Sequence, residues 1–163
     1  MKDLLPLSLR VNGERHDLLI RPWRTLLEVL RENLGLTGAK RSCQEGQCGA
    51  CTVLIDGKPV NSCLYLAIEA QDKEILTIEG LGRGDAGLHP IQKSFAEKGA
   101  VQCGFCTAGL ILTTKALLDE NPNPSEDEVR NGIVGHLCRC TGYFQIVEAV
   151  LDAAREMRSE GRR

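Results

Sequence analysis

Residues 43–63 read CQEGQCGACTVLIDGKPVNSC, a stretch that holds half of the cysteines of the chain. The four are Cys43, Cys48, Cys51 and Cys63. Three of them fall in one short loop, and the fourth follows after eleven residues. Gaps of four and then two residues are the spacing of plant-type [2Fe–2S] sites, in which four thiolates hold the cluster. The first half of the chain is therefore predicted to fold around one such cluster.

The glycines of this loop have a physical role. Gly46 and Gly49 permit a positive φ, which lets neighbouring N–H groups turn toward the sulfur atoms. Such donors stabilise the negative charge of a cluster and influence its potential. A gap of four residues is also wider than the paired spacing typical of structural zinc. Zinc is therefore the weaker interpretation of this first set.

A second set of cysteines lies in the stretches QCGFCTAGL, residues 102–110, and HLCRCTGY, residues 136–143. The four are Cys103, Cys106, Cys138 and Cys140. Thr107 and Thr141 follow the two pairs, and each is predicted to begin a helix. Two helix N-termini would then point at one metal site, where their dipoles favour added negative charge. The sequence thus predicts a second metal site.

The composition narrows the explanations for eight cysteines in 163 residues. A net charge of −2, from 20 basic and 22 acidic residues, removes the electrostatic case for nucleic-acid binding. No stretch approaches the 18 or so apolar residues of a membrane span, which predicts none. The N-terminal MKDLLPLSLRVNGERHD lacks the apolar centre of a signal peptide, which predicts a cytoplasmic protein. Disulfides are rare there, so metal or redox use is favoured.

The hydrophobic periodicity predicts an α+β chain. Strands are expected at 7–11, 18–20, 52–55 and 75–78, with an Asn12-Gly13 hairpin turn. Helices are expected at 26–34 after the cap Thr25, and then at 89–98, 108–120, 125–135 and 143–157. The glycine-rich stretch GLGRGDAGLHP, residues 80–90, separates the two cysteine sets. We predict one domain at 1–80, a linker at 81–88 and a helical domain at 89–163.

The two cysteine motifs together resemble the small iron–sulfur subunit of the molybdenum hydroxylases. This is the xanthine dehydrogenase family, which includes aldehyde oxidoreductases and 4-hydroxybenzoyl-CoA reductases. The resemblance runs from about residue 5 to residue 157. It implies an N-terminal β-grasp ferredoxin-like domain and a C-terminal four-helix domain, each with one [2Fe–2S] cluster. It further implies that the chain passes single electrons between molybdopterin in a large subunit and FAD in a medium subunit.

The same resemblance implies roles for particular positions. Gln102 and Cys140 would lie near the molybdopterin of the partner subunit, and the Gln102 amide can both donate and accept a hydrogen bond. The chain would perform no substrate chemistry itself and would work in a hetero-oligomer, with a dimer of heterotrimers as one arrangement. Two positions depart from the family pattern, since Ala108 replaces a frequent proline and His136 a frequent asparagine. His136 is interpreted as a helix C-terminal residue or as a donor beside the second cluster, because both sets already supply four thiolates.

Two other functions stay open on sequence grounds. One is a free-standing ferredoxin that diffuses between partners, and the other is a structural module stabilised by zinc. Diffusing redox partners tend to meet through small, polar, charged contacts. A near-neutral chain with a second cysteine set therefore argues against a diffusing carrier. Colour separates the zinc module from the iron–sulfur protein, since zinc sites do not absorb visible light.

Overall fold

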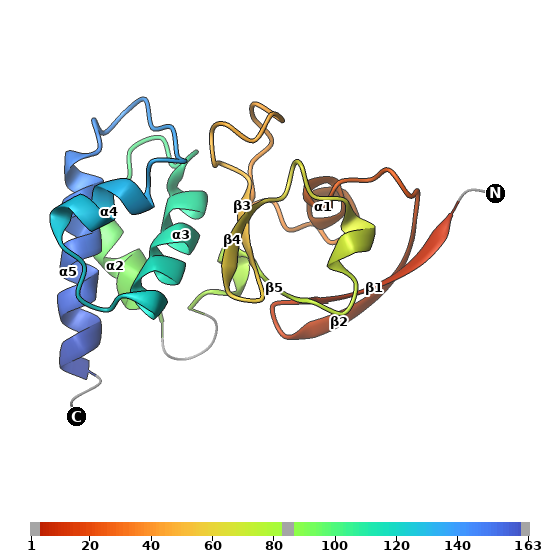
Figure 1. Cartoon of the computed structure of the whole chain (residues 1–163), viewed down its shortest axis with the longest axis horizontal. Coiled ribbons are helices and arrows are strands. Elements are labelled where there is room, and N and C mark those ends of the chain that lie inside the picture. The colour runs from red at the N-terminus through yellow and green to blue at the C-terminus, as the bar shows by residue number, and fades with distance from the viewer. Residues whose placement is uncertain (1–3, 83–86, 161–163) are drawn as a thin grey trace.

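The structure is a computed structural model that describes residues 4–82 and 87–160 of the chain. Figure 1 shows a sheet half beside a helical half. The strands are β1 (Leu5–Val11), β2 (Glu14–Ile20), β3 (Thr52–Ile55), β4 (Lys58–Asn61) and β5 (Glu74–Leu76). The helices are α1 (Leu26–Glu28), continued by a π-helical turn (Val29–Asn33), then α2 (Pro90–Glu97), α3 (Thr107–Glu120), α4 (Glu126–Gly132) and α5 (Phe144–Glu160). The predicted α+β class is confirmed.

The sheet is mixed, in the order β2-β1-β5-β3-β4. β1 runs parallel to β5, and the other neighbouring pairs are antiparallel. The predicted hairpin turn joins β1 to β2, with φ of 55° at Asn12 and 80° at Gly13, which is the sign pattern of a type I′ turn. The Asn12 side chain also accepts a hydrogen bond from the Thr77 N–H at 2.9 Å. The turn is thereby fixed to the segment that follows β5.

Each half has its own hydrophobic core. In the sheet half, alternate β1 residues such as Leu7 and Leu9 pack against Leu26 and Leu30 of the helical segment after β2. In the helical half, Phe95 of α2 is fully buried with residues of α3, α4 and α5. Packing of this kind is how short helices bury their apolar faces. The two cores lie on either side of the β3–α3 contact.

β3 is the strand at which the two halves meet. All four of its residues are buried, whereas each of the other strands has exposed positions. One face of β3 adds to the core of the sheet half, and α3 packs on the strand from the helical half. A strand buried on both faces reads as a continuous apolar run, as TVLI does.

Several predicted boundaries were wrong. The strand expected at 75–78 ends at Leu76 and is followed by a 3₁₀ turn (Ile78–Gly80), and the expected helix 125–135 ends at Gly132. β4 was not predicted, because KPVN carries no hydrophobic alternation and gains its structure from pairing with β3. Leu81, expected in the linker, is buried in the helical core. Residues 83–86 of that linker lie outside the described part of the chain, and the domain boundaries stay a prediction.

None of the helices in the described residues is long and apolar enough to cross a membrane.

The capping box at the start of α4 makes a measurable contribution to stability. Ser125 Oγ accepts from the Glu128 N–H, and the Glu128 carboxylate accepts from the Ser125 N–H at 2.7 Å. We expect Ser125→Ala to lower the free energy of unfolding by about 1 kcal/mol, because the N–H of Glu128 loses its side-chain acceptor. Chemical denaturation of the iron-loaded chain measures it. Ser159→Ala, on the exposed end of α5, is the control and should change little.

Candidate metal centres

The first cysteine loop is held in shape by hydrogen bonds from β3 and β4. Asn61 Nδ2 donates to the carbonyl of Gly46 at 2.9 Å, and Thr52 Oγ1 donates to that of Gly49 at 2.8 Å. Ser62 Oγ donates to the Cys51 carbonyl at 2.6 Å. Gly46 and Gly49 have φ of 75° and 67°, as the glycine argument predicted. The loop therefore keeps its form through polar contacts to the sheet.

The thiols of the first set meet in two pairs. Cys43 lies within hydrogen-bonding reach of Cys48, and Cys51 lies within reach of Cys63. The N–H of Glu45, followed by that of Cys48, lowers the pKa of Cys43 to about 6. Burial raises the pKa of Cys51 to about 11. One pair thus lies toward solvent, among backbone donors, and the other lies inside the sheet half.

The second set shows the same division. The thiol of Cys103 is paired with that of Cys140, and both residues are exposed. Cys106 is paired with Cys138, and burial raises the pKa of Cys106 to about 12. Burial alone would raise the pKa of Cys138, but hydrogen bonds from the hydroxyl and N–H of Thr141 bring it below the usual value. Thr141 Oγ1 lies 3.1 Å from Cys138 Sγ.

The helix termini near the second set of cysteines differ from the predicted ones. α3 begins at Thr107, and Cys106 occupies the cap position that was expected for Thr107. α5 begins at Phe144 rather than at Thr141, because Gly142 and Tyr143 take positive φ values of 62° and 70°. One helix terminus, that of α3, directly adjoins a cysteine. The expected second terminus is replaced by the side chain of Thr141.

The arrangement of thiols fits a binuclear cluster at each set. In the described residues, no three side chains of His, Cys, Asp or Glu come together as a group that could hold a single metal ion. In each set, neighbouring thiols shift one another's pKa, and four thiolates are the ligands that a [2Fe–2S] cluster needs. N–H and hydroxyl donors directed at the sulfur atoms of Cys43 and Cys138 suit an anionic cluster.

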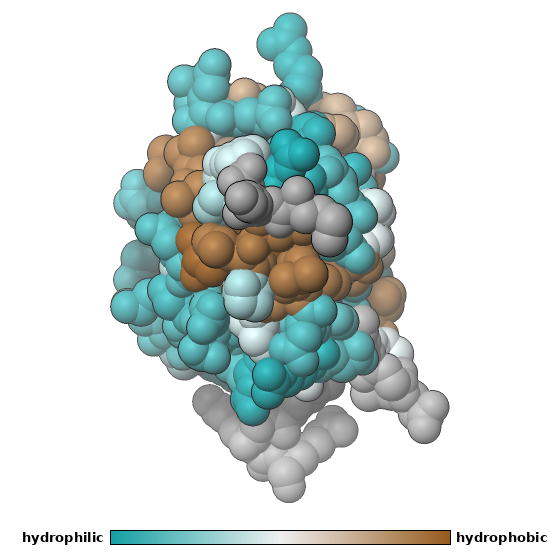
Figure 2. All heavy atoms as spheres, turned by 90° about the vertical axis from the view of Figure 1, so that its right-hand side faces the viewer, coloured by the Kyte–Doolittle hydropathy of each residue, from teal (hydrophilic) through white to brown (hydrophobic). Residues whose placement is uncertain are grey.

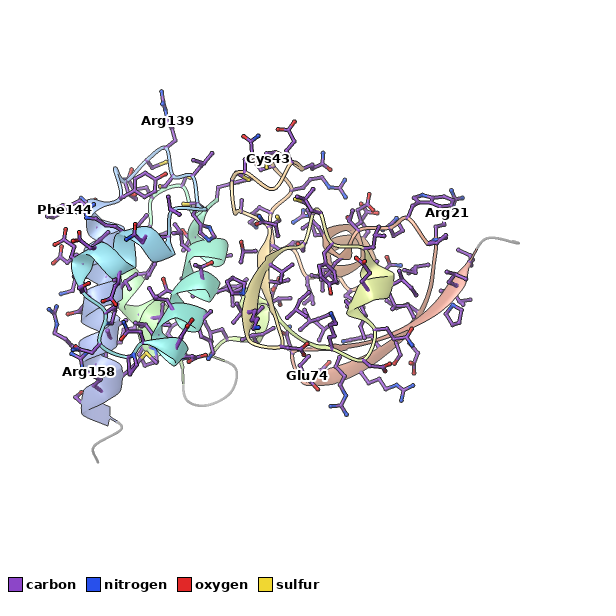
Figure 3. The ribbon with its side chains drawn as sticks, in the orientation of Figure 1. Arg21, Cys43, Glu74, Arg139, Phe144 and Arg158 are labelled. Carbon is purple, nitrogen blue, oxygen red and sulfur yellow. The ribbon has the colours of Figure 1, made fainter. Side chains whose placement is uncertain are left out.

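The two cysteine loops touch each other. The N–H of Leu137 donates to the carbonyl of Cys48 at 3.1 Å. Leu137 precedes Cys138, so this backbone bond joins the two sets directly. In Figure 3, Cys43 and Arg139 lie along the same edge of the molecule. Sequence reasoning did not foresee this contact, because no local pattern indicates a hydrogen bond between backbone groups so distant in the chain.

His136 lies beside this contact. The prediction that it ends a helix was wrong, since α4 ends at Gly132 and His136 is a loop residue with only 5% of its surface exposed. Its Nε2 is 2.7 Å from Thr113 Oγ1 in α3, and no hydrogen bond to a cysteine thiol is described for it. Burial lowers the pKa of His136 to about 4, so the ring is neutral at neutral pH.

Large apolar side chains are exposed in the segments that carry or follow the second set of cysteines. Gln102 is exposed next to Cys103. Large hydrophobic residues exposed in these segments are Val101, Phe105, Val134, Leu137 and Phe144. Phe144 projects outward from the start of α5 in Figure 3. Exposed apolar groups of this density are typical of a surface that contacts another protein.

Comparison with known proteins identifies a [2Fe-2S] binding domain in each half of the chain. The family described as "2Fe-2S iron-sulfur cluster binding domain" matches residues 9–77, and that described as "[2Fe-2S] binding domain" matches residues 77–151. The nicotinate dehydrogenase small FeS subunit of Eubacterium barkeri is 48% identical over 146 residues, which are 90% of this chain and 92% of that subunit. The chain belongs to the iron–sulfur subunits of the molybdenum hydroxylase family.

Solved structures of this family have the same fold. A chain of quinoline 2-oxidoreductase from Pseudomonas putida 86 matches with a TM-score of 0.93 and 46% identity, over 98% of this chain and 99% of that one. The aldehyde oxidoreductase of Desulfovibrio desulfuricans matches with a TM-score of 0.90 and 47% identity, but this chain covers 17% of it. In that relative, the corresponding iron–sulfur unit is part of a much longer chain.

The assignment of cysteines to two separate sites predicts separable losses. We expect Cys63→Ser and Cys106→Ser each to lower bound iron to about half, because each removes one ligand of a different cluster. Iron analysis and electron paramagnetic resonance of the reduced chain measure this. Ser42→Ala, exposed beside the first loop, is the control and should keep full iron. Full iron in both cysteine variants would contradict the assignment.

Proposed function

We propose that this chain is the electron-transfer subunit of a multi-subunit molybdenum hydroxylase. One [2Fe–2S] cluster would be held by Cys43, Cys48, Cys51 and Cys63, and the other by Cys103, Cys106, Cys138 and Cys140. Each cluster, when bound, takes up and releases a single electron. The chain itself binds and orients these groups and carries no substrate chemistry.

The contact between the two loops is the observation that carries this proposal. The Leu137 N–H to Cys48 C=O bond, at 3.1 Å, connects a ligand of one set to the neighbour of a ligand of the other. Redox centres must lie close together to exchange electrons through protein. Two clusters that are held by separate cores and joined at their ligand loops suit electron transfer from one cluster to the other. A structural metal site would not need a second metal site nearby.

The exposed edges of the two sets suggest where partners bind. Cys103 and Cys140 are exposed with Gln102 beside them, which supports a large subunit whose molybdopterin lies against this face. The first set would then serve FAD in a medium subunit, through the side on which Cys43 lies. The apolar residues around the second set support a lasting interface rather than a brief encounter.

A second apolar area lies at the opposite end of the molecule. Leu4, Leu5 and Leu19 are exposed there, and Figure 2 shows a hydrophobic area on this face surrounded by hydrophilic residues. Exposed apolar patches of this kind support more than one partner. The hetero-oligomer we propose contains the large and medium subunits, with a dimer of heterotrimers as one arrangement. The division into domains 1–80 and 89–163 belongs to the same proposal.

A cytoplasmic location also belongs to this proposal. All eight cysteines are free in the structure, and thiolate ligands persist in a reducing compartment.

Purification of the native complex tests the proposed function. Tagged full-length chain, isolated from its own cells, should elute with two larger subunits and bring molybdopterin and FAD with it. Size-exclusion chromatography with cofactor analysis measures this. A brown chain that elutes alone and supports full electron transfer would favour a diffusing ferredoxin. A colourless chain containing zinc would favour the structural module, and either result would overturn the proposal.

A further inference from the structure

We propose that His136 is a positioning residue that sets the spacing between the two cysteine loops and so governs electron exchange between the clusters. The inference rests on the proposed function and adds a role for a residue that is not a metal ligand. Three sets of contacts hold the imidazole ring between the two cysteine loops.

The first contact ties the ring to the helical half. Nε2 of His136 lies 2.7 Å from Thr113 Oγ1. His136 is buried, with 5% of its surface exposed. Thr113 is on α3, the helix that begins immediately after Cys106. The position of the ring is therefore linked through one rigid helix to a ligand of the second set.

The second contact fixes the backbone that carries the ring. The hydroxyl of Tyr143 donates to the carbonyl of His136 at 3.0 Å and accepts from the N–H of Cys138 at 2.8 Å. The N–H of His136 donates to the carbonyl of Ile133 at 3.0 Å. Both the ring and the main chain of His136 are held, so the residue can act as a fixed spacer.

The third contact places the first cysteine loop against this spacer. A Cβ built on Gly49 would lie 2.3 Å from His136 Nδ1 and 2.7 Å from the carbonyl oxygen of Gly135. A Cβ built on Gly109 of α3 would lie 2.3 Å from the carbonyl oxygen of Gly49. The loop, the ring and the helix are therefore in close contact, with no space for a methyl group between them.

These contacts act on the hydrogen bond that joins the two loops. Gly49 follows Cys48, and His136 precedes Leu137, so the ring packs next to the Leu137 N–H to Cys48 C=O bond. Nδ1 has no hydrogen-bond partner among the described residues, so toward Gly49 the ring acts through its shape. Removing the ring, or inserting a methyl group at Gly109, should change the separation of the loops while all eight thiols remain.

Four substitutions test the inference in the full-length chain within its complex. His136→Ala removes the spacer, and Thr113→Val removes its hydrogen bond while Thr113→Ser retains it. Gly109→Ala forces the loops apart, although alanine favours the helix itself. Gly132→Ala is the matched control, because its Cβ would meet only the flexible end of Leu117, at 3.0 Å.

Two readouts separate positioning from general damage. Hydrogen exchange at the Leu137 amide reports the bond between the loops, and the magnetic coupling of the two reduced clusters reports their spacing. We expect faster exchange and an altered coupling in His136→Ala and Thr113→Val, and faster exchange with weaker coupling in Gly109→Ala, all with full iron content. Thr113→Ser and Gly132→Ala should match the unaltered chain.

Unchanged coupling and exchange in His136→Ala and Gly109→Ala would overturn the inference. Loss of the second cluster's iron in His136→Ala and Thr113→Val would overturn it as well, since His136 would then support ligation rather than spacing. Failure of the proposed function is recognised separately, because the unaltered chain would then lack two [2Fe–2S] signals.

Discussion

The packing of α3 against β3 is the contact on which the rest of the molecule depends. The strand leads out of the first cysteine loop, and the helix leads out of the pair Cys103 and Cys106. When these elements pack, two independently built cores bring their metal-binding ends to one edge (Figure 3). Because β3 is buried on both faces, it cannot turn one face to water without exposing an apolar surface. The spacing of the two sites is thus a property of the fold, and it is adjusted locally by the residues at the contact.

Apolar and polar groups stabilise different parts of the molecule. Apolar burial holds each half together, while hydrogen bonds from Asn61, Thr52 and Ser62 shape the first loop. Backbone N–H groups and the Thr141 hydroxyl supply the donors near sulfur. A cluster that changes charge is stabilised by donors that are already oriented, because they need not reorganise when the charge changes. The protein therefore provides a fixed polar shell within a rigid apolar frame.

The sequence predicts those features of the fold that are caused by residues close together in the chain. The type I′ turn at Asn12-Gly13 and the cap at Thr25 each depend on a few neighbouring residues, and all were confirmed. The spacing of the cysteines likewise allowed the family to be predicted, and the family was confirmed. The strand β4 and the burial of His136 were missed, because each results from pairing with a segment far along the chain. The helix N-terminus expected at Thr141 was wrong, since the positive φ of Tyr143, just before α5 begins, has no signal in its residue type.

The outward-facing pair Cys103 and Cys140 leaves one side of the second cysteine set open to solvent. These thiols are open to solvent, whereas their companions Cys106 and Cys138 lie deeper in the helical half. Iron and sulfide can approach these two thiols directly from solvent. The same side is where a large subunit would dock, and docking would close that entrance. With the proposed docking, a cluster loaded before association would meet an open site, and one loaded afterwards would meet a covered one.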